Sequence, residues 1–135
     1  MRDHGEVPQR VVEQRIRNRI IEYLELAASF EAQAACQRAV PRVNVAIDVV
    51  NQWGDWVRTD PPTRADLPDV FSDAEVETMG AYAEAVNAAA VVLPGGFPDL
   101  AEVQRLKEWE SLRKTAGEAL RVFEVRGRLS EDREA

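Results

Sequence analysis

Apolar residues recur at helical spacing over the first third of the chain. The steps between them are three and four residues, which places them on one face of an α-helix. Pro8 suits a first helical turn, and Pro41 disfavours helix at Val40. The pattern predicts one helix at about residues 8–40, with a break near Ser29 as the alternative. Its inward positions are Val12, Ile16, Ile20, Tyr23, Ala27, Phe30 and Ala34.

The next apolar segment fits two kinds of element. Residues 43–49 alternate apolar and polar side chains, which is typical of a β-strand. The segment also continues at helical spacing, and Asn44 is a natural N-cap. A lone strand would leave its backbone groups unpaired, and the sequence offers no second strand-like run. We therefore predict a helix at about residues 44–58. Its inward positions are Ile47, Val50, Trp53 and Val57.

A capping box marks the start of a third helix. Ser72 and Glu75 have the spacing at which each side chain bonds the other residue's backbone N–H. Helical spacing follows until Pro94, Gly95 and Gly96 end the pattern, which predicts a helix at about residues 72–93. Its inward positions are Val76, Met79, Ala83, Val86, Ala90 and Leu93.

A fourth helix is predicted at about residues 99–126. Asp99 and Glu102 resemble a second capping box, and Gly127 fits the left-handed position that ends many helices. Charged and small residues dominate positions 128–135, so we expect this tail to fray. The inward positions of the helix are Val103, Leu106, Trp109, Leu112, Ala116, Leu120 and Phe123.

These elements predict an all-α fold in a single domain over residues 1–135. The loop at 59–71 carries Pro61, Pro62 and Pro68, which make it stiff and extended. The expected architecture is four-helix bundle-like, with this long proline-rich connection between the second and third helices crossing the end of the bundle.

Composition removes several kinds of catalytic site. The chain has one cysteine, Cys36, and one histidine, His4, among its 135 residues. Internal disulfides, cysteine-based zinc sites, two-histidine metal sites and histidine-dependent triads are therefore excluded within one chain. No phosphate-binding glycine motif is present. We expect no catalytic residue, no metal and no cofactor, and we expect Cys36 to be a buried, unreactive thiol.

The formal net charge of −7 disfavours non-specific binding to nucleic acid. The only local cluster of cations is Arg15, Arg17 and Arg19. Glu13 and Glu22 lie at helical spacing from its members, so we expect a solvated face with internal ion pairs.

The sequence favours a cytoplasmic protein. Its charged start lacks the apolar run of a signal peptide. The longest apolar stretch, residues 88–93, is far shorter than the ~20 residues of a membrane span, so we expect no membrane partner.

Two tryptophans close to the proline-rich segment are the most unusual feature. Trp53 continues the apolar face of its helix and is expected in the core, whereas core and interface are equal alternatives for Trp56. Gly54 costs ~1 kcal/mol inside a helix relative to alanine, so close packing or a kink is expected there. The candidate partner-binding residues are Gln52, Trp53, Asp55 and Trp56.

The leading hypothesis is a non-catalytic helical protein that acts by protein–protein interaction, as an adaptor, an immunity or inhibitor protein, or an assembly subunit. The alternative is a small-molecule-binding protein or enzyme with its site around residues 51–69. A pocket that joins Asn51, Asp55 and Asp66 would favour that alternative. A third hypothesis is an acidic mimic of nucleic acid, which the interleaved arginines disfavour.

Unequal helix lengths predict a two-fold homodimer. A helix at 8–40 outruns the shorter one at 44–58, so the flank at Val11 and Ile21 is expected to stay bare. Residues 88–93 are apolar on all sides, which implies further neighbours. A second copy would bury both surfaces. A break near Ser29, or a proline-rich segment lying along the flank, would remove this basis.

Overall fold

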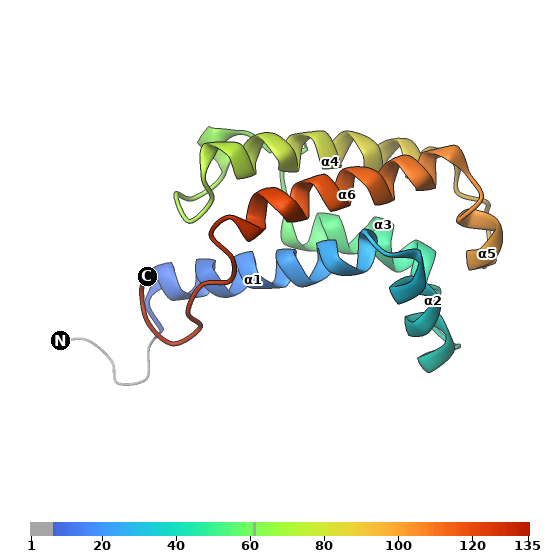
Figure 1. Ribbon diagram of the computed structural model, residues 1–135, viewed down its shortest axis with the longest axis horizontal. Helices are drawn as coiled ribbons and strands as arrows, with labels where there is room; N and C mark the ends of the chain where they lie inside the picture. Colours follow the sequence, from blue (N-terminus) through green and yellow to red (C-terminus); the bar gives the residue numbers. More distant parts are fainter. Residues whose placement is uncertain (1–6, 61) are drawn as a thin grey trace.

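The computed structural model describes residues 7–60 and 62–135, which contain six α-helices, one short 3-10 helix and no β-strand (Figure 1). The all-α prediction is confirmed for these residues, and His4 and Pro61 lie outside them. The helices are α1 (Gln9–Ala27), α2 (Phe30–Ala39), α3 (Val45–Trp56), α4 (Asp73–Val92), α5 (Leu100–Val103) and α6 (Lys107–Glu124), and the 3-10 helix η1 is Arg64–Asp66.

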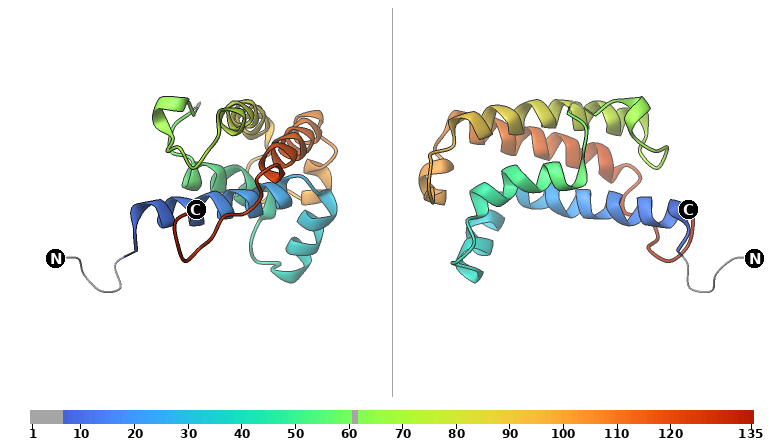
Figure 2. Two further views of the ribbon diagram at one scale, coloured as in Figure 1. Left: turned by 60° about the vertical axis from the view of Figure 1, so that its left-hand side comes forward. Right: turned by 180° about the vertical axis from the view of Figure 1, so that it is seen from behind.

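The four long helices form a closed ring of neighbours. Helix α4 packs on α6, α6 on α1, α1 on α3, and α3 on α4. Figure 2 shows the pair α4 and α6 stacked over α1 and α3, with α2 and α5 at one end. The largest apolar side chains that the ring fully buries are Trp109, Tyr82, Phe123, Ile20, Leu24, Met79 and Leu112.

The helix predicted at 8–40 is two helices. Helix α1 ends at Ala27, and α2 starts after Ser29, whose side chain accepts a hydrogen bond from the Ala32 N–H at 3.0 Å. Serine competes with the backbone for hydrogen bonds and favours such N-cap positions. The alternative that this helix breaks near Ser29 and folds back is correct in the break, but α2 turns away from the ring (Figure 1).

Gln33 stabilises this break. Its side chain is fully buried and donates to the carbonyls of Leu26 and Ala27 at 3.2 and 3.1 Å. Its amide oxygen accepts from the indole N–H of Trp109 at 3.0 Å. The last carbonyls of a helix lack hydrogen-bond donors within the helix. Gln33 provides donors for two of them and, through Trp109, joins the bend to α6.

The predicted helix at 99–126 is also interrupted. Helix α5 ends at Val103 and α6 begins at Lys107. The second capping box does not form, because the Asp99 side chain accepts no backbone hydrogen bond. In the interruption, Gln104 donates to the Phe30 carbonyl at 3.1 Å, which joins this bend to the start of α2.

Three local predictions about helix ends are confirmed. The Asn44 side chain caps α3 by accepting from the Ile47 N–H at 3.0 Å. Ser72 and Glu75 form both hydrogen bonds of the capping box. Gly127 has a φ of 72°, and its N–H donates to Phe123 O at 2.8 Å, so it ends the last helix as expected.

Two expectations about surface groups are wrong. The tail at 128–135 is not free of the fold, because side chains of α1 hydrogen-bond its backbone. Arg17 is not solvated: it is fully buried and donates to Glu75 at 2.7 Å instead of pairing with Glu13. The Arg19–Glu22 pair does form, at 3.5 Å.

The buried carboxylate of Glu75 is the centre of an ion network. It accepts from Arg17 at 2.7 Å, from Arg126 at 2.6 Å and from the Ser72 N–H at 2.9 Å. Arg17 also donates to the Gly127 carbonyl at 2.8 Å. Burial lowers the pKa of the Arg17 guanidinium from its ordinary value, and the charge of Glu75 opposes that effect. The network joins the start of α4 to α1 and to the end of α6.

Replacement of Glu75 by glutamine tests this network. Glu75→Gln is expected to lower the free energy of unfolding by about 3–5 kcal/mol, because it leaves the Arg17 charge buried without a counter-ion. The exposed Glu77 on the same helix gives a matched control, and Glu77→Gln should change stability by no more than about 0.5 kcal/mol. Urea unfolding measures both. A loss below about 1 kcal/mol for Glu75→Gln would place the pair among weak surface ion pairs and contradict the prediction.

Candidate functional site

The two tryptophans of α3 have different environments. Trp53 is 5% exposed and lies 4.9 Å from Tyr82 and 5.9 Å from Tyr23 between ring centroids. The expectation that Trp53 belongs to the core is confirmed. Trp56 is 36% exposed at the last position of the helix. Its indole is therefore the one of this pair that a partner can reach.

Hydrogen bonds fix the aromatic cluster below Trp53. The Tyr23 hydroxyl donates to the Val49 carbonyl at 2.6 Å, so the 2.7 Å contact between the tyrosine hydroxyls has Tyr82 as its donor. Burial raises the pKa of both hydroxyls above the ordinary tyrosine value. Both groups stay protonated at neutral pH, and the cluster serves packing.

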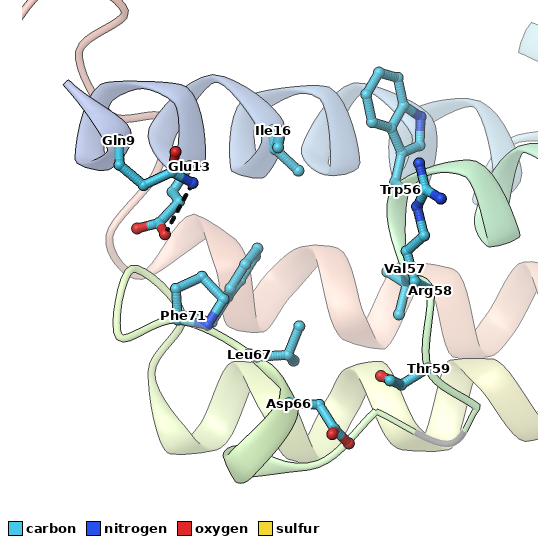
Figure 3. Close-up of a pocket in the computed structure, with 11 residues that line it drawn as sticks. Gln9, Glu13, Ile16, Trp56, Val57, Arg58, Thr59, Asp66, Leu67 and Phe71 are labelled. Atoms are coloured by element: carbon cyan, nitrogen blue, oxygen red, sulfur yellow. Dashed lines mark hydrogen bonds between the residues drawn. The ribbon is translucent and has the colours of Figure 1, made fainter. Parts of the chain in front are cut away.

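Trp56 lies beside a pocket of about 240 Å³ (Figure 3). The pocket lies between the first half of α1, the end of α3 and the connection that follows α3. We call it the Trp56 groove. Its lining residues are Gln9, Glu13, Ile16, Trp56, Val57, Arg58, Thr59, Asp66, Leu67, Pro68 and Phe71.

The Trp56 groove has an apolar interior and a charged edge. Figure 3 shows Ile16, Val57 and Leu67 directed into the space between the two sides. Glu13 lies at one end and Arg58 at the other. The volume is below the ~300–1,000 Å³ of pockets for drug-sized ligands. One large apolar side chain, with polar contacts around it, suits this space better than an extended small molecule.

Arginine side chains hold the wall formed by the connection. Arg64 donates to the carbonyls of Pro68 and Phe71, both at 2.7 Å, and to Asp73 at 3.0 Å. Arg10 of α1 pairs with Asp69. These contacts fix the irregular backbone of residues 64–71 without a regular ladder of hydrogen bonds.

The other candidate residues lie away from the Trp56 groove. Asp55 is exposed, Gln52 is half-buried, and neither lines the groove. Asn51 lines a second cavity of about 290 Å³, together with Asn87 of α4. The structure therefore does not bring Asn51 and Asp55 together with Asp66, which was the arrangement that would favour an enzyme.

Two further expectations are corrected here. Gly54 has open space around it, since a Cβ added there would meet no heavy atom within 4 Å. Of the two alternatives expected at this glycine, close packing is therefore absent. Cys36 is half-buried on α2, so it is not the fully buried thiol that the sequence suggests.

The sequence did not indicate that residues of the first helix would meet those of the connection in one groove. Ile16 belongs to the predicted inward stripe of the first helix, yet it is only half-buried and opens into the groove. Leu67 and Phe71 come from the connection, which has no periodic pattern. The prolines and aspartates around them indicated only a loop.

Among residues 7–60 and 62–135, no three acidic, cysteine or histidine side chains cluster in a way that could hold a metal ion. Within that same part of the chain, each helix is too short or too polar to cross a bilayer. Comparison of the chain with protein-family models, with curated proteins and with solved structures gives no match.

Truncation of the two tryptophans should have opposite consequences for stability. Trp53→Ala is expected to cost ~3–5 kcal/mol, because it removes a buried ring from the tyrosine cluster. Trp56→Ala should cost about 1 kcal/mol or less, because its ring is in contact with solvent. Equal shifts of the urea midpoint in the two variants would contradict the assignment of Trp56 to the surface.

Proposed function

We propose that this is a non-catalytic cytoplasmic protein that acts by binding another protein, as an adaptor, an inhibitor or an assembly subunit. In this proposal the Trp56 groove, on a four-helix bundle with the proline-rich connection as one wall, receives an apolar side chain of the partner. The observation that carries the proposal is the exposed indole of Trp56 at an apolar pocket. Tryptophan next to a pocket is typical of interface positions that contribute most to binding.

The charges around the groove indicate the chemistry of the partner. Glu13 and Asp66 line it. Arg58 is the cation in the lining. With a net charge of −7, the chain favours a partner segment that carries a lysine or arginine beside its apolar side chain.

The other two function classes have weaker support. A small ligand would have to use the Trp56 groove with Thr59, Asp66 and Arg58, and its volume is small for that purpose. An acidic mimic needs a contiguous negative face, whereas Asp69 and Asp73 beside the groove are paired with arginines. Native mass spectrometry of the purified protein would detect a retained small ligand.

The proposal predicts that one side chain separates folding from binding. Partners captured from the native host are identified by mass spectrometry, purified, and titrated directly against the full-length chain. Trp56→Ala is expected to weaken the affinity by about 2 kcal/mol or more, as loss of a binding hot spot does. Its helical circular dichroism should remain unchanged.

Val125 offers a matched control, because it is an apolar residue, 85% exposed, at the end of α6. Val125→Ala should bind the purified partner as the natural chain does. If Trp56→Ala also keeps full affinity, the groove is not the interface and the proposal fails. Retention of a stoichiometric small molecule that Trp56→Ala releases would move the assignment to ligand binding.

The structure leaves only one of the two apolar surfaces on which the predicted homodimer was based. The flank at Val11 and Ile21 is 0% and 4% exposed, so the expectation that it stays bare is wrong. The end of α4 and the turn after it remain apolar and open, with Val91 85% and Phe97 63% exposed. We propose that a second copy covers this end.

Light scattering coupled to gel filtration tests the dimer. The natural chain is expected to have twice its 15.1 kDa mass at tens of micromolar, and Val91→Asp is expected to give the single mass. Val125→Asp, a charge placed on an equally exposed valine at the far end of α6, should leave the dimer intact. A single-chain mass for the natural protein would contradict the proposal.

A further inference from the structure

Helix α1 has a second buried face in addition to the one that faces the core. Val11, Gln14 and Asn18 are 0%, 0% and 1% exposed. Their spacing places them on one side of the helix, and Glu13 and Ile16 of the Trp56 groove lie on another. Two of the three are polar, and buried polar groups need hydrogen-bond partners.

The partners of Asn18 come from the segment after Gly127. The Asn18 amide donates to the Leu129 carbonyl at 2.8 Å and accepts from the Leu129 N–H at 3.0 Å. The side chain thus makes the same pair of hydrogen bonds to Leu129, one to its C=O and one from its N–H, that a neighbouring antiparallel β-strand would make. Figure 1 shows this segment running along the first half of α1.

Gln14 and Arg15 continue the same mode of recognition. Gln14 donates to the carbonyls of Ser130 and Arg133 at 2.8 Å and accepts from the Ala135 N–H at 2.8 Å. Arg15 donates to the Glu131 carbonyl at 2.8 Å. Side chains of a helix here bind the backbone of a segment without helix or strand, which bends at residues 131–133. Such contacts require no particular side chain at most positions.

One position of the segment is recognised by its charge. The Glu131 carboxylate accepts from Asn18 at 2.9 Å and pairs with Arg19. The hydrogen bond from Asn18, with the charges of Arg19 and Arg15, lowers the pKa of this carboxyl. The face formed by Gln14, Arg15, Asn18 and Arg19, which we call the α1 polar face, therefore favours a segment with an acidic residue at this position.

The segment is held by few apolar contacts. It has no helix or strand of its own, residues 132–135 are exposed, and Leu129 is its partly buried apolar residue against the core. Gly127 connects it to α6 in a left-handed conformation. Segments with little apolar burial open locally at a small fraction of the cost of global unfolding.

We propose that the α1 polar face is a binding site for an acidic segment of a partner protein that has no helix or strand of its own, and that residues 128–135 occupy it as an intramolecular competitor. This site is separate from the Trp56 groove and does not depend on the proposed function of that groove. The identical segment of a second copy would gain nothing over the tethered one, which has an effective concentration in the millimolar range. A partner segment with additional acidic or apolar contacts is the occupant that can displace it.

The test weakens the tethered segment in the full-length chain and offers the same sequence in solution. Leu129→Pro removes the N–H that donates to Asn18 and the packed leucine side chain. A fluorescent peptide of residues 128–135 with blocked ends is titrated by anisotropy. The Leu129→Pro chain is expected to bind it about tenfold or more tightly than the natural chain does, because the competitor is released. Asn18→Ala in the Leu129→Pro background should abolish this binding.

Two altered peptides distinguish sequence-specific binding from non-specific binding. A peptide carrying the Leu129→Pro change should not bind, and one carrying Glu131→Gln should bind more weakly. Absence of peptide binding by a folded Leu129→Pro chain would overturn the proposal. Binding that persists with Asn18→Ala would also overturn it.

Circular dichroism establishes that the variant chain is folded. If Leu129→Pro loses its helical signal, Glu131→Lys, which opposes Arg15 and Arg19, takes its place in the same titration. Unfolding of both variants would show that the segment is an indispensable part of the fold, and the proposal would fail. A natural dimer that Leu129→Pro, but not Val91→Asp, converts to single chains would assign the face to a second copy's segment and overturn the choice of a partner.

Discussion

The buried carboxylate of Glu75 is the constraint on which the arrangement of the helices depends. A charge removed from water is costly unless other groups pair with it and saturate its hydrogen bonds. Arg17, Arg126 and the Ser72 N–H do so together, and Arg17 also lies 4.9 Å above the ring of Phe123. These groups come from α1, from the start of α4 and from the end of α6. The bonds form in one relative register of the three helices, so the network adds specificity to a core that apolar packing stabilises.

Local chemistry was predictable from the sequence, and distant pairing was not. The N-cap at Asn44, the capping box at Ser72 and the end of the last helix at Gly127 each depend on residues within four positions. Arg17 bonds Glu75 across 58 positions, and Gln33 bonds Trp109 across 76. Helical spacing placed Arg17 beside Glu13, because spacing within one helix contains no information about the elements that cover it.

In the candidate site too, the part set by local spacing was predictable and the part set by distant segments was not. Helical periodicity was sufficient to assign Trp53 to the core, since the residue continues an apolar stripe that faces other helices. The environment of Trp56 depends on the path of residues 57–71. The buried side chains of Val57, Val70 and Phe71 and the hydrogen bonds from Arg64 to backbone carbonyls hold that path. Leu67 and Phe71 therefore enter the groove from a segment without periodicity, and Gln52 and Asp55 are left outside it.

Both proposed binding surfaces are formed by α1 together with segments outside the helices, and neither is formed by the ring of helices alone. The apolar side of α1 at Ile16 is left partly open by residues 57–71, whereas the polar side at Gln14 and Asn18 is covered by residues 128–135. Hydrogen bonds from α1 side chains to backbone groups hold residues 128–135, whereas Val57, Val70 and Phe71 anchor residues 57–71 in the core. Residues 128–135 bury little apolar surface, and segments of that kind open locally before the core does. In the proposal above, their release opens the polar side of α1 to a partner, while the network around Glu75 keeps the helices in place.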